Sequence, residues 1–359
     1  MLKNGKPDRE YWSIVKGIGI LCVIIGHSWM DLQSFVYAFH MPLFFFVSGY
    51  LYDEKKYGDQ PYTYTAKRIK STWVKYVIWE CVFILLHNFF YEKGMLYGIG
   101  IESHIFSKTE MLSEMAKAVL GCANEILVGA LWFAPVLVIA TVVLSFIVSI
   151  SRSVERTIGK HFLKVSFQIV CIVICGSIGY LLIDQQQTLS ASIQISLAVI
   201  PYIWLGYLVR NYLKDMGKYM NGFLAMMVLL VVFIVSRRYL ISLANGFVYP
   251  FMYILAAFGI YGCLYIAKVI LKTRVFKKIF VILGEASFFL MASHLFVLRL
   301  FDRIYCIRFG GDWIKYYEKL PVAFDEFAPI YLLVGIGVPT AIWGVYHWFQ
   351  RKLANERVL

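Results

Sequence analysis

The stretch WSIVKGIGILCVIIGHSWM (12–30), followed after three residues by SFVYAFHMPLFFFVSGYLY (34–52), decides the fold. Each run is about as long as an α-helix must be to cross a hydrocarbon core of ~30 Å. A chain in lipid has to satisfy its own backbone hydrogen bonds, so runs of this length are helices rather than open strands. The two runs therefore predict a pair of transmembrane helices joined by a short connection.

The same pattern continues along the chain. The 359 residues are 60% hydrophobic and only 16% charged, and the mean hydropathy of +0.67 lies far outside the range of a soluble globular chain. We therefore predict an all-α polytopic membrane bundle of about ten transmembrane helices. The ten runs lie near 12–30, 34–52, 72–91, 126–150, 165–183, 189–209, 221–236, 246–267, 279–301 and 328–349.

The basic residues predict the orientation. Of the 35 Lys and Arg residues, 23 fall in the two tails and the even-numbered gaps between spans, 9 fall in the odd-numbered gaps, and 3 lie within spans. By the positive-inside rule both termini are cytoplasmic, and the protein is a multi-pass protein of the cell (plasma or inner) membrane. The excess of basic residues thus describes a cytoplasmic membrane surface, and no nucleic-acid partner is expected.

The chain predicts a single integral-membrane domain over 1–359. The first run carries Lys16, lacks a small-residue cleavage site and leads directly into a second span, so it is a retained helix and not a signal peptide. No fixed-period repeat or low-complexity linker divides the chain. Within the longest external stretch, 92–125, apolar residues recur at helical spacing and predict an amphipathic helix that caps the bundle or lies at the interface.

Two pairings stay open at this point. Glu80 and Glu285, both within predicted spans, either form a buried pair or line a polar cavity. Cys122 and Cys306 both lie towards the outer side, but their spacing says nothing about their separation. The other five cysteines fall within spans and are expected to pack as small apolar groups.

Ionisable side chains within spans are functional candidates, because a charge in lipid is costly. Lys16 and His27 are eleven residues apart, and eleven steps of 100° place both side chains on nearly the same helix face. At 1.5 Å per residue they lie ~16 Å apart along the axis, so they cannot touch one reacting atom unless Gly17 and Gly19 break the helix. Lys16, near the cytoplasmic end, suits a phosphate, whereas His27 lies in the outer half.

Three histidines fall at a similar depth in the outer half of the bundle: His27, His40 and His294. One such histidine is usually a hydrogen-bonded packing residue, but three at one level favour a site. Neutral imidazole, with a reference pKa of ~6.5, is a natural general base for an alcohol. No acidic or cysteine ligand accompanies the three at ligand spacing, which disfavours a metal. Asp31 either orients His27, if the first helix continues, or is a plain loop residue.

The stretch REYWSIVKGIGILCVIIGHSW followed by FHMPLFFFVSGYLY, between Arg9 and Tyr52, resembles the acyltransferase type three family of ten-span membrane O-acyltransferases. Lys16 and His27 match that family's basic residue, ten intervening residues and histidine, although arginine is the commoner basic residue. KRIKSTWVKYVIW (67–79), ALWFAPVLV (130–138) and LGEASFFLMASHLF (283–296) resemble later family segments in the same order. The motif FHMPLFFFVSGYL is most similar to the branch of fucose acetylases and exopolysaccharide acetyltransferases.

The resemblance implies transfer of an acetyl or other acyl group from cytoplasmic acetyl-CoA to a hydroxyl of a carbohydrate or cell-surface polysaccharide precursor. It implies His27 as the general base, with Lys16, Arg68, Lys67 and Lys70 binding CoA phosphate, and no permanently bound cofactor. The proposed pocket residues are His40, Ser48, Trp132, His294 and Asp31. Some relatives carry an extracellular esterase-like domain, which is not expected here.

Each of these roles has an alternative that involves no acyl transfer. Ser48 is either a covalent acyl carrier or part of a tight Ser-Gly helix contact, and Trp132 is either a pocket residue or membrane packing. For the whole protein, a transporter or flippase of a lipid-linked sugar also places charges within spans, but it predicts internal pseudo-symmetry, and none is visible. A non-enzymatic sensor or scaffold predicts that His27→Ala is tolerated.

Overall fold

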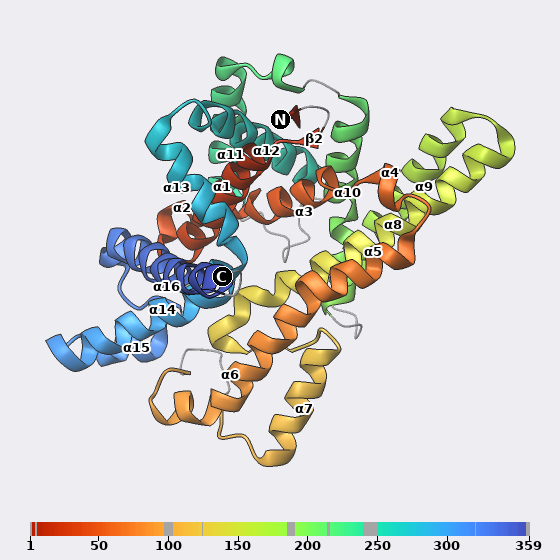
Figure 1. Ribbon diagram of the computed structural model, residues 1–359. Coiled ribbons are helices and arrows are strands. Elements are labelled where there is room, and N and C mark those ends of the chain that lie inside the picture. The colour runs from red at the N-terminus through yellow and green to blue at the C-terminus, as the bar shows by residue number, and fades with distance from the viewer. Residues whose placement is uncertain are drawn as a thin grey trace.

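The computed structural model describes residues 2–3, 6–96, 103–123, 125–184, 191–213, 216–239, 250–319 and 321–356. Its regular structure is helical apart from one two-residue antiparallel ladder, between β1 (Leu2–Lys3) and β2 (Lys6–Pro7) (Figure 1). The first residues of the predicted runs at 189–190 and 246–249 lie outside the described residues. The prediction of an all-helical membrane protein is confirmed.

The two opening runs form three helices: α1 (Arg9–Ser28), α2 (Met30–Tyr37) and α3 (His40–Tyr50). The side chain of Asp8 caps α1 by accepting hydrogen bonds from the first backbone N–H groups. Helix α1 ends because Trp29 is extended, with φ −138° and ψ 92°. The second run is divided at Phe39, whose φ of −144° lies outside the helical range.

The remaining helices follow in chain order. They are α4 (Glu54–Tyr57), α5 (Pro61–Arg68), the π-helical turn η1 (Ile69–Trp73), α6 (Val74–Glu92), α7 (Lys108–Val119), the 3-10 helix η2 (Ile126–Trp132), α8 (Phe133–Ile158), α9 (His161–Asp184), α10 (Ala191–Tyr212), η3 (Met216–Tyr219), α11 (Gly222–Arg238), α12 (Phe251–Ile270), α13 (Arg274–Glu285), α14 (Ser287–Phe309), α15 (Trp313–Glu318), η5 (Asp325–Phe327) and α16 (Ala328–Glu356).

Among the described residues, seven helical segments are long and apolar enough to cross a membrane, and the bent pair α13 and α14 gives up to eight. The pair is bent by 80°. Helices α6 and α11 occupy the other two predicted runs but are not among the seven, and α11 has only 17 residues. The predicted count of ten is therefore not confirmed. The seven segments are Arg9–Ser28, Asp31–Tyr50, Ile126–Ile158, His161–Ile183, Ser192–Tyr212, Phe251–Ile270 and Asp325–Leu353.

The bundle has two parts that meet at α3 and α10. Figure 1 shows α5, α6, α8 and α9 as a slanted layer beside the group that contains α1, α12 and α13. At the junction, a β-carbon added to Gly49 would overlap the carbonyl oxygen of Ile203, and one added to Gly206 would overlap that of Phe46. Two glycines thus let α3 and α10 approach backbone to backbone, as small residues do in membrane helix pairs.

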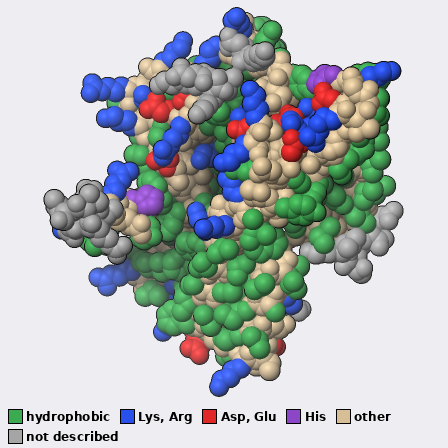
Figure 2. Space-filling model, turned by 45° about the vertical axis from the view of Figure 1, so that its right-hand side comes forward, with side chains coloured by type: hydrophobic (Ala, Val, Ile, Leu, Met, Phe, Trp, Pro, Cys, Tyr) green, Lys and Arg blue, Asp and Glu red, His purple; other side chains and the backbone are tan. Residues whose placement is uncertain are grey.

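Charged and apolar side chains occupy different parts of the surface. Figure 2 shows Lys, Arg, Asp and Glu side chains gathered over one part of the face, with a broad area of hydrophobic side chains beside and below them. Large apolar side chains are exposed along the outward faces of α6, α9 and α11, including Leu85, Val173 and Met226. Exposure of this kind is expected of helices whose solvent is lipid.

The structure also resolves the open predictions for the loops and pairings. The predicted external helix is α7, which begins with a reciprocal capping box between Ser107 and Glu110. Cys122 is exposed and Cys306 is buried, and both are free thiols. Glu80 is buried and accepts a hydrogen bond from the backbone N–H of Glu125, so it does not pair with Glu285.

Candidate active site

Three helices bring the predicted histidines together. His27 lies in the last turn of α1, His294 in α14 and His40 at the start of α3. The ring centroids of His27 and His294 are 5.3 Å apart. Tyr37 links His27 to His40, with centroid separations of 6.2 Å and 5.1 Å. His294 and His40 are buried and His27 is half-buried, so the cluster lies within the bundle.

The backbone fixes the tautomers of two of these rings. Nδ1 of His294 lies 2.8 Å from the carbonyl oxygen of Leu290, and Nδ1 of His40 lies 2.7 Å from that of Val36. A carbonyl oxygen only accepts hydrogen bonds, so each Nδ1 is the protonated donor. When the ring is neutral, Nε2 therefore carries a lone pair. In His294 this Nε2 is buried and has no hydrogen-bond partner.

The break after α1 shapes this cluster. Because α1 ends at Ser28 and Trp29 is extended, α2 turns back and brings Tyr37 against the end of α1. Gly26 makes room for it, since a β-carbon there would lie 2.5 Å from Cε1 of the Tyr37 ring. Gln33 donates a hydrogen bond of 2.9 Å to the Gly26 carbonyl and holds α2 in place.

The same break bears on the two alternatives for Asp31. The first helix does not continue past Ser28, so the spacing of four residues does not place Asp31 over His27. Asp31 lies exposed in the first turn of α2, and no hydrogen bond joins it to His27 in the described part of the chain. It is therefore a helical residue and not a loop residue, and its proposed place in the substrate pocket stays a prediction.

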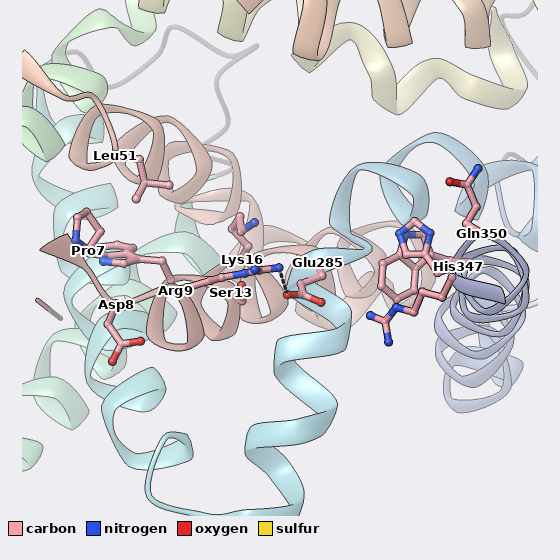
Figure 3. Close-up of a pocket in the computed structure, with 12 residues that line it drawn as sticks. Pro7, Asp8, Arg9, Ser13, Lys16, Leu51, Glu285, His347 and Gln350 are labelled. Atoms are coloured by element: carbon pink, nitrogen blue, oxygen red, sulfur yellow. Dashed lines mark hydrogen bonds and ion pairs between the residues drawn. The ribbon is translucent and has the colours of Figure 1, made fainter. Parts of the chain in front are cut away.

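Lys16 lies about three turns away, in a cleft with a volume of about 780 Å³. Helix α1 is continuous through Gly17 and Gly19, so its separation of ~16 Å from His27 along the axis holds. The lining combines both ends of the chain, as Figure 3 shows for several of its residues. They are Pro7, Asp8, Arg9, Trp12, Ser13 and Lys16, then Leu51 and Glu285, and finally Trp343, His347, Gln350 and Arg351 of α16.

The cleft is rich in cations. Arg9, Lys16 and Arg351 line it, and only Arg9 has a described ion-pair partner, Glu285 at 2.9 Å. Figure 2 shows a hollow in the charged part of the face with Lys and Arg side chains around it. A cleft that combines several cations with the apolar side chains of Trp12, Leu51 and Trp343 can bind a polyanion.

The basic segment of α5 does not line this cleft. Lys67 and Lys70 are exposed, and the Lys67 ammonium lies 5.0 Å from the ring centroid of Tyr57. Arg68 differs, because its Nε and Nη2 atoms are buried without a hydrogen-bond partner. Buried donors without an acceptor cost free energy, so an anion that accepts hydrogen bonds from Arg68 would lower this cost. It is followed by the π-helical turn η1, a feature frequent at functional sites.

The other two predicted pocket residues are both half-buried. Ser48 is adjacent to Gly49, whose backbone contacts α10, which agrees with the packing alternative. Trp132 ends η2 and packs against the main hydrophobic core. Helix η2 lies against α14, which carries His294. The described contacts give neither residue a partner among the three histidines.

Sequence reasoning missed Tyr37, Arg9 and Arg351. Tyrosine is common near membrane interfaces, and arginine near the ends of spans is ordinary, so neither residue type gave a signal. Among the described residues, no three or more His, Cys, Asp or Glu side chains are arranged to hold a metal ion.

Several apolar helices of membrane-spanning length, together with the family comparison, define the class, a multi-pass membrane acyltransferase. Residues 9–349 match an acyltransferase domain, and the chain belongs to the acyltransferase 3 family. No curated protein and no solved structure matches the chain.

Proposed function

We propose that this protein transfers an acetyl group from cytoplasmic acetyl-CoA to a hydroxyl of a carbohydrate or cell-surface polysaccharide precursor. Membership of the acyltransferase 3 family supports acyl transfer and does not favour the transporter alternative. The observation that carries the proposal is the half-buried His27, whose ring centroid lies 5.3 Å from that of a buried His294 with no partner at Nε2. Such a pair supplies a base for the reacting hydroxyl and a hydrogen-bond acceptor for a second hydroxyl of the substrate.

In the proposed reaction His27 removes the proton from the acceptor hydroxyl. The oxygen attacks the thioester carbonyl carbon, the carbon–sulfur bond breaks, and the imidazolium returns the proton to the departing CoA thiolate. Nε2 of His294 accepts a hydrogen bond from the acceptor and orients it. The ester product and free CoA balance the reaction without another reactant, and no permanently bound cofactor is required.

Binding of the acyl donor is proposed to depend on positive charge. Lys16 in the cleft, and Arg68 with its unpartnered donors, are proposed to bind the phosphates of CoA, and the exposed Lys67 and Lys70 add positive charge beside Arg68 in the sequence. The thioester arm then extends along α1 towards His27. This arrangement requires the cleft to face the cytoplasm, where acyl-CoA is found, and it agrees with the orientation that the basic loops predict.

The test is transfer of radiolabelled acetyl-CoA by the purified protein in detergent. We expect His27→Ala to lower kcat by about 10²- to 10⁴-fold, the usual contribution of a general base. Lys16→Ala should raise the KM for acetyl-CoA by about tenfold or more and lose less in kcat, because it removes a charge-assisted contact to donor phosphate. The proposal fails if wild-type protein neither binds nor consumes acetyl-CoA, or if His27→Ala keeps full activity.

A further inference from the structure

Helix α13 does not share the direction of α14, from which it is bent by 80°, and Figure 3 shows it crossing α1 beside the cleft. If α14 spans the membrane, a helix bent from it by 80° runs close to the membrane plane. The position also places α13 at the Lys16 end of α1, since a β-carbon added to Gly284 would overlap the carbonyl oxygen of Ser13.

The side chains of α13 separate into three faces. Four large apolar residues are exposed on one side: Val275, Phe276, Ile279 and Ile282. Gly284 lies on a second side and meets the α1 backbone, whereas Leu283 is buried at the C-terminal end of the side that carries the apolar residues. At 100° per residue, Arg274 and Lys278 lie on a third side, away from the centre of the apolar face. An apolar face flanked by a basic one is the pattern of helices that lie in the interface of a bilayer.

The basic face has more charge than the protein neutralises. Lys277 pairs with Glu10 at 3.2 Å. Lys272, Arg274 and Lys278 are exposed, and none of them has an ion-pair partner in the part of the chain that the structure describes. Nearby acidic residues do not compensate, because Glu10 is taken by Lys277, and Glu285 is taken by Arg9 at 2.9 Å.

We propose that α13 is an interfacial helix that binds the headgroups of anionic phospholipids through Lys272, Arg274 and Lys278. The exposed apolar face enters the acyl-chain boundary, and the three cations then lie at the level of the phosphates. Continuity favours lipid over a protein partner, because α12 just before it exposes Ile266 and Val269 as part of the same apolar surface.

The bound lipid also holds one wall of the donor cleft. Glu285 ends α13 and lines the cleft, and Gly17 of α1 lies so close to α13 that a β-carbon there would overlap the carbonyl oxygen of Phe280. Lys272, Arg274 and Lys278 do not line the cleft, so lipid binding by these residues is measured without reference to catalysis.

The test titrates the detergent-purified protein with short-chain phosphatidylglycerol or phosphatidylcholine and counts bound lipid by native mass spectrometry. The test variant carries Lys272→Gln, Arg274→Gln and Lys278→Gln. A matched control carries three exposed cations from elsewhere on the predicted cytoplasmic side, as Lys55→Gln, Lys56→Gln and Lys160→Gln. A third variant keeps the charge, with Lys272→Arg, Arg274→Lys and Lys278→Arg.

We expect wild type, the matched control and the charge-keeping variant to prefer phosphatidylglycerol. The test variant should lose affinity for phosphatidylglycerol on the order of a hundredfold, since each cation near an anionic surface contributes about a fivefold factor. Phosphatidylcholine binding should stay unchanged in all four. The inference is overturned if wild type shows no preference, if the test variant keeps it, or if the matched control loses it equally.

Discussion

At the scale of single residues, the imidazole of His294 has one nitrogen left for chemistry. Its Nδ1 is committed to the Leu290 carbonyl, so any role in the site passes through Nε2. Asparagine can place an amide N–H near the Nδ1 position but has no atom at Nε2. The two functions of the ring, anchoring and accepting, are therefore separable by substitution.

We expect His294→Asn to lower kcat by about a hundredfold, as loss of one preorganised hydrogen bond at a reacting group does. The melting temperature of His294→Asn should fall less than that of His294→Ala, which loses both the anchor and the volume. Turnover of acetyl-CoA and thermal unfolding in detergent measure the two effects. Full activity in His294→Asn would reduce this histidine to a packing residue.

The three histidines can be predicted from the sequence because they are ionisable residues within spans. The residues around them, such as Tyr37, carry no such signal. An ionisable group in a span is rare enough to be noticed alone, and His27, His40 and His294 were chosen on that ground. Tyr37 becomes part of the cluster only because Trp29 turns the chain back, and the residues around Trp29 give no sign of that turn in the sequence. The same turn places Asp31 at the start of α2 and not in a continued first helix.

At the scale of elements, the contact between α1 and α13 depends on Gly17 and Gly284. A β-carbon at Gly17 would overlap the Phe280 carbonyl, whereas nothing lies within 4 Å of one added to Gly337 in α16. We expect Gly17→Ala to destabilise the protein by about 1–3 kcal/mol through overpacking. Gly337→Ala should be neutral or stabilising by up to about 1 kcal/mol, because alanine favours helix.

Thermal unfolding of the two glycine variants beside wild type gives the comparison. A Gly17→Ala protein as stable as Gly337→Ala would mean that α13 moves away from α1 without cost. The close helix contact described here would then not be a determinant of the cleft.

Helix α4 ties the two parts of the bundle together through Glu54. The carboxylate accepts hydrogen bonds from Lys164 at 2.6 Å, Arg152 at 3.0 Å and Tyr207 at 2.7 Å. Burial alone raises the pKa of Glu54, but the hydrogen bonds from Lys164, Tyr207 and Arg152 outweigh it and leave the pKa below its ordinary value of 4.5. The charged form is therefore favoured by folding.

The sign of the pH effect follows from linkage. A carboxyl whose pKa is lowered on folding stabilises the protein above the unfolded pKa, and this contribution is lost as the pH falls through the folded pKa. We expect the difference in melting temperature between wild type and Glu54→Gln to be full near about pH 6 and to shrink below about pH 4. Glu318→Gln, at an exposed residue of α15, should show no such difference at either pH.

A difference between wild type and Glu54→Gln that stays constant with pH would show that the lost interactions do not depend on the charge of Glu54. The stabilising effect of the side chain would then be one of hydrogen-bond geometry and packing.

Run length and apolarity predicted most helices but not where they break. The predicted span 279–301 reads as one continuous apolar helix with no proline. The structure divides it at Ala286, where α13 turns to meet α1 through Gly284. Gly284 packs against Ser13, which is 271 residues away in the sequence. A local sequence pattern cannot predict such a contact.

At the scale of the whole molecule, the two ends of the chain meet. Pro7 and Arg9 line the same cleft as Gln350 and Arg351, so these two segments are close together. We therefore expect them to lie on one side of the membrane, and a chain that returns to its starting side crosses an even number of times. Eight crossings, with α13 and α14 counted as one, or ten, with α6 and α11 added, would meet this expectation.

We expect a reporter joined after α16 and a reporter inserted near Lys3 to report the cytoplasm, as the basic loops predict. A reporter in α7, such as after Glu114, should report the outside if α6 crosses the membrane. Alkaline phosphatase and green fluorescent protein fusions distinguish the two sides. Opposite locations for the two ends would contradict the shared cleft, and a cytoplasmic α7 would remove α6 from the count.

The cleft takes its walls from segments made at very different times. Residues of α1 leave the ribosome early, whereas the wall residues of α16, from Trp343 to Arg351, emerge after all the others. A nascent chain therefore contains Lys16 and His27 long before the cleft has its α16 wall. If the cleft binds the acyl donor as proposed, a chain without α16 has no complete donor site.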